Sequence, residues 1–394
     1  MKQALQKRDL IIVPFHDWRK SEREGFRTRD VHFINALAKH PTVGKILVIN
    51  RPCTWLELRV KKFDKDLSGD KIISKGNFEL TKVADNIYVS DFMSCRFVQQ
   101  ILQKNRWFFK MYAHESYVQF IKACTQKLRL SAPGLLIQNI FAFQLASKLP
   151  VENKLFDAWD NFVKFPAYKQ FTVDLIHAYS QLAIRSPHWI TNSLENKNLF
   201  LQEYGPERIS VVKNGVKANI FSKTQSIPDD MMDIPRPIAG FGGKISYLLN
   251  TDLINLISRE NPNISFVFVG QILDKTAYNK IEKTPNVYFL GDKHYSEYPS
   301  YVNSFDICIV PYRIGKDQHG GDSIKVYEYL LTGKKVVGTN GNGLQDLTDY
   351  VYVVESPAEF SKELQDPTNR KQLVDPEEHS WDKKADLIID HLFG

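Results

Sequence analysis

Short apolar runs alternate with longer amphipathic stretches along the chain, most regularly in its second half. Near-continuous apolar runs that end in Gly, Pro or another turn residue are typical of strands buried on both faces of a parallel sheet. Runs of this kind lie at 238–243, 264–270, 287–291, 306–312, 334–340 and 350–356. Because helix-length segments separate them, we expect a doubly wound α/β domain in this half of the chain.

The first half repeats this pattern more loosely. Apolar runs lie at 10–15, 45–50, 86–90, 154–159 and 188–193, and helical patterns cover 30–39 and 97–127. The simplest architecture is therefore a pair of Rossmann-like domains, 1–200 and 201–376, whose connection includes the Pro-rich segment 227–237.

Composition and charge narrow the class of protein. Of the 394 residues, 43% are hydrophobic and 25% charged, a globular balance that can bury two cores. The net charge of +7 is unevenly spread, because basic residues outnumber acidic ones up to Arg185 and acidic residues prevail afterwards. The first domain is therefore the basic one.

One basic stretch, 104–129, also carries Trp107, Phe108, Phe109 and Tyr112. This composition suits an anionic membrane surface or nucleic acid. The alternative is an amphipathic helix whose aromatic residues are core and whose charges are solvated. A nucleic-acid binder would leave the motif at 320–340, described below, without a role.

The cysteines and the apolar segments indicate the cellular compartment of the protein. The four cysteines are scattered, with no CxxC pair, which favours a reducing compartment over a disulfide framework. The apolar run near the start is too short for a signal-peptide core, and the uncharged stretch 131–147 is interrupted by polar residues. We expect a cytoplasmic protein without a membrane span.

The segment "GGDSIKVYEYLLTGKKVVGTN" at 320–340 follows the predicted strand 306–312 and contains a short helix, 324–332. Ligands of parallel sheets bind at the carboxyl ends of the strands, where this helix begins. Asp322 or Ser323 is the expected N-cap, and the helix N-terminus together with Lys325 can bind a phosphate. Glu328, one turn on, can accept hydrogen bonds from ribose hydroxyls. The alternative is a surface helix with an ordinary ion pair between Lys325 and Glu328.

Other loops at this edge supply further candidates. The glycines of "GFGGK" at 240–244 allow a phosphate to approach the backbone closely, although they also fit a tight turn. The predicted nucleotide-donor residues are Gly242, Gly243, Lys244, Gly270, Arg313, Ser323, Ile324, Lys325 and Glu328.

The segment "SIKVYEYLLTGKKVV" resembles the donor-binding signature of GT-B glycosyltransferases, in particular family-4-type enzymes and xanthan-type glucuronosyltransferases. "ISVVKNGVKANIF", "VYFLGDKHYSEYPSYVNSFDICIVPY" and "HSWDKKADLIIDHL" resemble further parts of these enzymes, in the same order. The resemblance implies two Rossmann-like domains with a cleft between them and a final helix, 377–394, that crosses back to the first domain. It also implies sugar transfer from a nucleotide donor, most simply a UDP-sugar, to a hydroxyl of a glycan or lipid-linked acceptor in bacterial surface polysaccharide synthesis.

Departures from the family pattern bear on the mechanism. Many family-4-type enzymes have a glutamate at the position of Gly320, so its replacement here favours inverting transfer. In xanthan-type enzymes an Asp after a later strand serves as the base, and Asp160 is the residue in register. Asp157 is the alternative within "FDAWDNF". His16, beside Asp17, is a further candidate base or acceptor ligand, or else a structural residue.

No metal and no cofactor are expected beyond the nucleotide-sugar. The Asp-x-Asp pair of metal-dependent transferases has a counterpart in "DKD" at 64–66, but no strand precedes it, so we interpret it as a solvated loop. Two alternatives to a transferase remain open at this point: a catalytically silent nucleotide-sugar-binding partner subunit and a nucleotide-sugar epimerase. The expected partners are the donor, the acceptor and possible peripheral contact with an anionic membrane, without nucleic acid.

Overall fold

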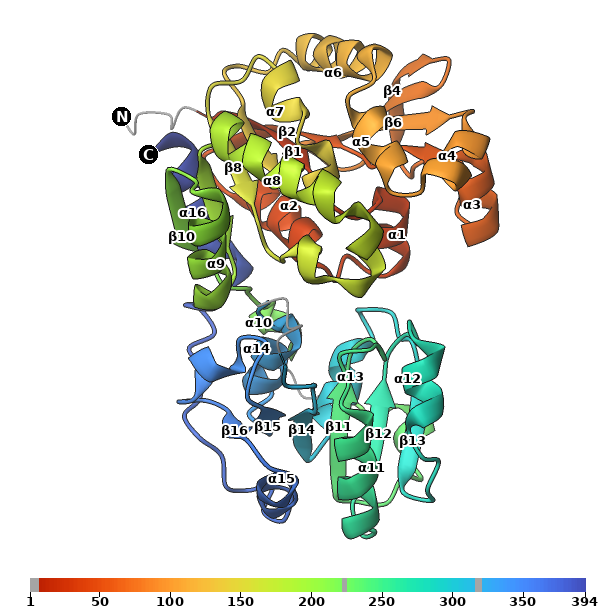
Figure 1. Ribbon diagram of the computed structural model, residues 1–394, viewed down its shortest axis with the longest axis vertical. Helices are drawn as coiled ribbons and strands as arrows, with labels where there is room; N and C mark the ends of the chain where they lie inside the picture. The colour runs from red at the N-terminus through yellow and green to blue at the C-terminus, as the bar shows by residue number, and fades with distance from the viewer. Residues whose placement is uncertain (1–6, 222–224, 316–320) are drawn as a thin grey trace. The chain divides into compact units, whose positions relative to one another are not determined.

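The computed structural model describes residues 7–221, 225–315 and 321–394 (Figure 1). It divides into two compact units, one formed by Met1–Lys213 with Lys384–Gly394 and the other by Asn214–Lys383. The first unit ends further along the chain than residue 200, where the sequence placed the boundary. The reason is strand β10 (Arg208–Val211), which pairs in parallel with β9 (His188–Thr191) and completes the first sheet.

The first sheet has the strand order β10-β9-β8-β7-β1-β2-β6-β5-β4, with the short β3 (Cys53–Thr54) beside β6. The pairs from β10 to β6 are parallel, and β5 and β4 add an antiparallel hairpin at one edge. Its remaining strands are β1 (Arg8–Val13), β2 (Val43–Ile49), β4 (Asp70–Lys75), β5 (Phe78–Lys82), β6 (Ile87–Ser94), β7 (Gly134–Ile137) and β8 (Lys154–Asp157).

Both faces of the central strands of this sheet are covered. Ile11 and Val13 of β1 belong to the apolar cluster on one face, whereas Leu10 lies on the other. The first face carries helices α5 (Arg106–Tyr112), α6 (Glu115–Leu128) and α8 (Thr172–Arg185). The second carries α2 (Arg29–Lys39) and the end of α16 (Trp381–Phe393), which are joined by His40 and Asp386 at 3.1 Å. This two-sided burial explains the near-continuous apolar runs.

The helical pattern at 97–127 is not one helix. It forms α4 (Phe97–Gln103), α5 and α6, because Lys104 adopts a positive φ of 51° and His114 has an extended backbone. Trp107, Phe109 and Tyr112 are buried, so the aromatic residues of this stretch belong mainly to the core. None of the described helices is both long and apolar enough to cross a bilayer.

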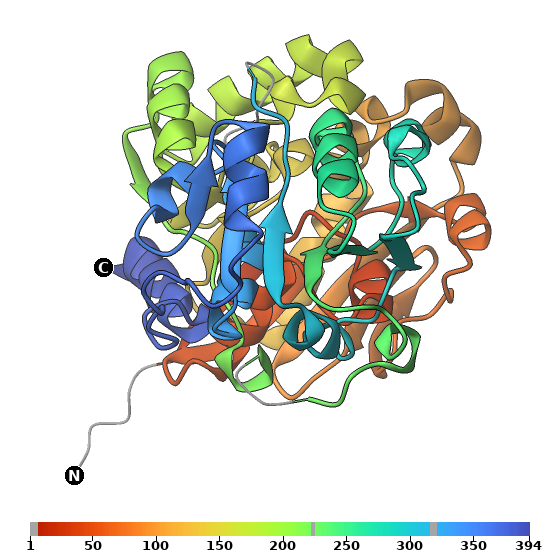
Figure 2. The ribbon, with the colours of Figure 1, turned by 90° about the horizontal axis from the view of Figure 1, so that it is seen from below.

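The second sheet is parallel throughout, in the order β13-β12-β11-β14-β15-β16, and all of its predicted strands are confirmed. The strands are β11 (Ile238–Gly242), β12 (Ser265–Val269), β13 (Val287–Gly291), β14 (Ile307–Val310), β15 (Lys335–Thr339) and β16 (Tyr352–Val354). Figures 1 and 2 show α11 (Thr251–Glu260) and α15 (Pro357–Glu363) on one face, and α13 (Tyr298–Ser304) and α14 (Ile324–Leu331) on the other.

Each sheet has a point where the strand order reverses direction. In the first it lies between β1 and β7, and in the second between β11 and β14. Loops at the carboxyl ends of such neighbouring strands diverge, which opens a crevice where ligands of α/β sheets bind. Each unit therefore has its own expected place for a ligand.

Candidate active site

In the second unit, the loops after β11 and β12 touch through their backbones. Gly243 donates its N–H to Val269 O at 2.8 Å. Gly270 has a φ of +153°, and a Cβ on it would lie 2.0 Å from Gly243 O. Only glycine permits this approach, so the two predicted glycines hold one loop against the other at the ligand edge of the sheet.

We expect Gly270→Ala to destabilise the second unit by about 1–3 kcal/mol, because the new methyl group meets a backbone oxygen that cannot move aside. Urea unfolding followed by circular dichroism measures this loss. Gly291→Ala is the matched control, since Gly291 also ends a strand at positive φ but a Cβ on it would meet only open space. Equal midpoints for the two variants would show that the contact with Gly243 is unimportant.

Lys325 extends from the first turn of α14 to the loop after β11 and to Tyr312, which follows β14. Its Nζ donates to the Tyr312 hydroxyl and lies 5.0 Å from the ring centre of Phe241 and 4.9 Å from that of Tyr312. A Cβ on Gly243 would lie 2.9 Å from this Nζ. Aromatic faces attract a cation without neutralising it. Within the described part of the chain, Lys325 has no ion pair with Glu328, which argues against the alternative of an ordinary surface ion pair.

The start of α14 is fixed by Asp322 rather than by Ser323. Ser323 occupies the N-cap position, but its side chain makes no capping hydrogen bond. The carboxylate of Asp322 instead accepts hydrogen bonds from Asn214 N at 2.7 Å and from the Tyr327 hydroxyl at 2.9 Å. Ser323 and Ile324 are both half-buried. Because the serine hydroxyl does not cap the helix, the first backbone N–H groups of α14, next to Lys325, are not engaged by it.

Glu328 is more buried than a surface helix predicts. The residue is only 4% exposed, and its Oε1 accepts a hydrogen bond of 2.7 Å from the Tyr295 hydroxyl. Burial first, and the charge of Glu328 second, raise the pKa of Tyr295 well above its usual value, so this hydroxyl stays a donor. Tyr329, on the same helix, bonds through its hydroxyl to the N–H of Gly242 at 2.6 Å. Helix α14 is thus tied to the glycine loop.

The remaining donor candidates lie at the same edge. Lys244 follows Gly243 directly and is half-buried. Arg313, in the loop after β14, is exposed and donates its Nε to Leu249 O at 3.0 Å. Gly320, on which the expectation of inversion partly depends, lies outside the described residues.

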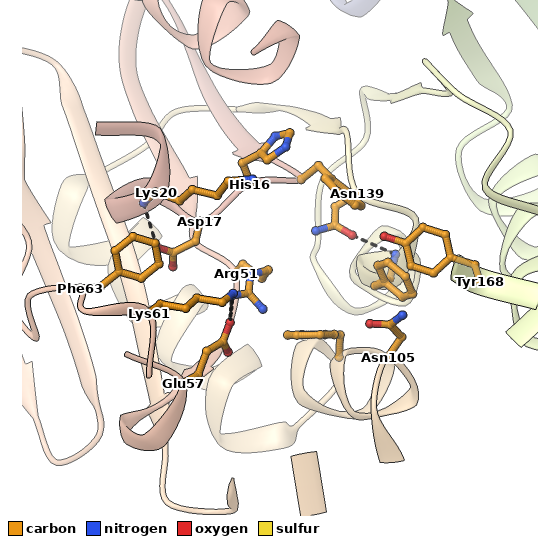
Figure 3. A pocket seen from close by; sticks show the side chains of 13 residues that line it. His16, Asp17, Lys20, Arg51, Glu57, Lys61, Phe63, Asn105, Asn139 and Tyr168 are labelled. Carbon is orange, nitrogen blue, oxygen red and sulfur yellow. Dashed lines mark hydrogen bonds and ion pairs between the residues drawn. The ribbon is translucent and has the colours of Figure 1, made fainter. Parts of the chain in front are cut away.

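In the first unit, a cavity of about 320 Å³ lies at the carboxyl ends of β1, β2 and β7 (Figure 3). Its volume falls at the lower end of the range of small-molecule sites. Aromatic rings and a few charged groups form its wall, the usual composition of such sites. The lining residues are Phe15, His16, Asp17, Lys20, Arg51, Glu57, Lys61, Phe63, Asn105, Phe108, Asn139, Phe141 and Tyr168.

His16 lines this cavity and pairs with Asp30, a residue that the sequence did not single out. The distance from His16 Nδ1 to Asp30 Oδ2 is 3.0 Å, and Asp30 also accepts from the His16 N–H and the Thr28 hydroxyl. Burial opposes ionisation of Asp30, but His16 and these hydrogen bonds outweigh it and lower its pKa. An ionised Asp30 favours the tautomer with a proton on Nδ1, which leaves Nε2 as the basic nitrogen.

Asp17, the neighbour that the sequence suggested as a partner, has another role. Its carboxylate caps α1 (Trp18–Arg23) by accepting from Arg19 N at 3.0 Å, and it accepts from Asn50 Nδ2 at 3.2 Å. Burial raises the pKa of Asp17. No local pattern marks Asp30 as the true partner of His16, because the pair forms only when α2 packs beside β1.

Charged residues on the opposite wall are paired with one another. Glu57 contacts Arg51, and its Oε1 lies 2.6 Å from Lys61 Nζ. Burial disfavours the charged form of Glu57, yet Arg51 and Lys61 together lower its pKa to about 2. The Arg51 guanidinium also lies 4.7 Å from the ring centre of Phe108. The wall therefore offers fixed hydrogen-bonding groups to a polar ligand.

The two aspartates proposed as bases differ in their surroundings. Asp157 is buried and bonded by Arg29 at 3.0 Å and by Gln138 Nε2 at 3.0 Å, so its oxygens are engaged in holding the unit together. Asp160 is 8% exposed, follows β8 and is not part of the cavity wall. Asp64 and Asp66 of the "DKD" stretch are exposed, as a solvated loop requires.

Solved structures share the two-sheet fold of this chain. A solved alpha,alpha-trehalose-phosphate synthase (UDP-forming) from Burkholderia vietnamiensis superposes with a TM-score of 0.66 over 98% of both chains at 10% identity. The trehalose-6-phosphate enzyme of E. coli, solved bound with UDP-2-fluoro glucose, gives a TM-score of 0.60 over 97% of this chain and 96% of that one, at 12% identity. These likenesses confirm the predicted GT-B fold.

Sequence comparisons cover a smaller part of the chain. A Bacillus subtilis protein named as a teichuronic acid biosynthesis glycosyltransferase, TuaH, is 32% identical over 142 residues. That alignment spans 34% of this chain and 35% of the relative. The family model described as Glycosyl transferases group 1 matches residues 244–367, which include Lys325 and Glu328. Residues 244–367, which lie within the second unit, therefore match the Glycosyl transferases group 1 family, and the chain has the GT-B fold.

Proposed function

We propose that this protein is a glycosyltransferase that moves a sugar from a UDP-sugar to a hydroxyl of a glycan or lipid-linked acceptor. The Bacillus relative, named for teichuronic acid biosynthesis, supports a role in surface polysaccharide synthesis. One solved neighbour is UDP-forming and another binds UDP-2-fluoro glucose, which supports UDP as the leaving group. The place of action in this proposal is the cytoplasm, where nucleotide-sugars serve as donors.

The observation that carries the proposal is the position of Lys325. Its ammonium group stands beside the backbone of Gly243, at the reversal point of the second sheet, and no carboxylate of the described residues neutralises it. A diphosphate bound here receives the full charge of Lys325 together with the N–H groups at the start of α14. Glu328, one turn further, is the proposed acceptor of the ribose hydroxyls. Because these groups supply the positive charge that stabilises the leaving diphosphate, the proposal includes no metal.

The acceptor is proposed to bind in the cavity of the first unit. Its hydroxyl oxygen attacks the anomeric carbon while its proton passes to Nε2 of His16. The bond between the anomeric carbon and the diphosphate oxygen breaks, and UDP leaves. This single displacement inverts the anomeric configuration. Asp30 holds His16 in the required tautomer. Asp160, which the sequence favoured as the base, becomes the second candidate because it does not line the cavity.

Lys325→Ala is expected to weaken UDP binding by about ten- to a hundredfold, because a charge-assisted hydrogen bond contributes about 1.5–3 kcal/mol. Isothermal titration calorimetry measures this loss. Lys280→Ala is the control, since Lys280 is an exposed lysine at the end of α12 (Lys275–Lys280). Unchanged affinity for Lys325→Ala would remove the basis of the proposed donor site.

Glu328→Gln tests the ribose contact, because glutamine keeps an acceptor for Tyr295 but loses the charge. We expect UDP to lose about tenfold in affinity and 2′-deoxy-UDP to lose less, so that the two ligands become more alike. If the variant weakens both ligands equally, Glu328 does not contact the 2′-hydroxyl.

Release of UDP from UDP-sugars by the wild-type protein separates an enzyme from a silent binding subunit.

A further inference from the structure

Helix α4 has an unusual surface for so short a helix. None of its residues is buried, and Val98, Ile101 and Leu102 are 55%, 61% and 76% exposed. Adjacent aliphatic side chains in water are unfavourable unless another surface covers them. The apolar side of α4 is therefore a candidate interaction surface.

Exposed apolar residues of two neighbouring helices extend this patch. On α3 (Trp55–Lys61), the ring of Trp55 lies 5.2 Å from that of Phe97. The start of α8 is held nearby by an ion pair of 2.7 Å between Arg106 and Asp174. We call the combined patch the α4 surface. Its apolar members are Trp55, Val98, Ile101, Leu102 and Val173.

The charges bordering the α4 surface are predominantly positive. Residues 92–114 contain Lys and Arg but neither Asp nor Glu. The nearby carboxylates of Glu57 and Asp174 are each paired with a basic side chain. The exposed basic residues around the patch are Arg59, Lys62, Arg96, Lys104, Arg106 and Lys110. An apolar patch within basic residues is complementary to an anionic bilayer, whose acyl chains take the aliphatic side chains and whose headgroups take the cations.

We propose that the α4 surface docks the first unit on an anionic lipid bilayer. The same elements also form one wall of the cavity: α3 supplies Glu57 and Lys61, and α5 supplies Phe108. Docking would therefore bring the cavity close to the headgroups. Resting on the proposed function, this arrangement favours an acceptor saccharide carried on a lipid over a free one. The expected stretch 104–129 takes part mainly through its basic residues, since most of its aromatic residues are buried.

Vesicle flotation of the full chain tests this proposal without donor or turnover, so its outcome is independent of the transferase assignment. We expect binding to phosphatidylcholine vesicles containing phosphatidylglycerol at low salt, weak binding to phosphatidylcholine alone, and release as salt shortens the screening length. Replacing Ile101 and Leu102 together by Ser should weaken binding at least about tenfold. Replacing Lys104 and Lys110 by Gln should cost about fivefold per lysine.

The matched control replaces Ile272 and Leu273 by Ser, because this pair is also exposed but lies in the second unit. Its binding should equal that of the wild type. The proposal is overturned if the wild type ignores anionic vesicles at low salt, or if the Ile101/Leu102 variant binds as tightly as the control. It is also overturned if light scattering shows a dimer that only the Ile101/Leu102 variant disrupts, since the patch would then join two copies of the chain.

Discussion

Replacing His16 with alanine is expected to lower turnover by about a hundred- to ten-thousandfold while leaving the affinity for UDP within about threefold. The reason is that His16 lines the cavity of the first unit, whereas the proposed nucleotide site belongs to the second. Single-turnover assays with a saturating donor measure the first quantity, and calorimetry with UDP measures the second. Added imidazole should restore part of the lost rate, because it replaces the missing base.

Two further variants make this result specific. Asp30→Asn should also lower turnover, because an amide no longer places a negative charge opposite Nδ1 of His16. Asp160→Asn should leave turnover within a few-fold if His16 is the base, and should lower it by the general-base factor if Asp160 is. Comparison of the product's anomeric configuration with the donor's by NMR checks the single displacement. Retention, or near-normal turnover of His16→Ala, would rule out the proposed role of His16.

Replacing Asp157 with asparagine is expected to destabilise the first unit by about 3–5 kcal/mol. Asp157 and Arg29 are both almost fully buried, and Arg29 also donates to Val212 O at 2.9 Å. The neutral amide cannot balance the guanidinium charge as the carboxylate does, so the interior loses a buried charge-assisted pair. Urea unfolding followed by tryptophan fluorescence measures the loss.

Asp174→Asn serves as the comparison for Asp157→Asn. Asp174 pairs with Arg106 at a largely exposed position, where an ion pair contributes at most about 1 kcal/mol. A stable Asp157→Asn protein with lost turnover would contradict the structural role and make Asp157 a candidate base again. A destabilised protein supports the assignment of Asp157 to the framework of the unit.

The second unit could be predicted in detail from the sequence because every strand of its sheet is parallel and largely apolar. The elements of the first unit were harder to predict. Strand β7 is apolar but has only four residues, too few to distinguish from a buried helix segment, and β4 exposes most of its side chains. The break between α4 and α5 depends on the backbone of Lys104, a conformation that helical periodicity does not reveal.

The two candidate sites also differ in how far local sequence could predict them. Lys325 and Glu328 lie on one short helix next to a recognisable strand, so local sequence is enough to suggest their proximity to the glycine loop. The partner of His16 was not predictable, because Asp30 is fourteen residues away and reaches it only through packing of α2 on the sheet. The ion pair of Asp157 with Arg29 spans a still longer separation, and a lone aspartate after a strand gives no sign of it.

The two aromatic rings that contact Lys325 affect how tightly a ligand binds. A free lysine side chain gives up as much as about 2 kcal/mol of rotamer entropy when it is immobilised. The rings of Phe241 and Tyr312 confine the side chain of Lys325 before any ligand arrives. Binding a diphosphate therefore requires little additional ordering, so a larger share of the electrostatic attraction appears as affinity. Removing one of the rings, by Phe241→Leu, would loosen the side chain of Lys325 without removing its charge.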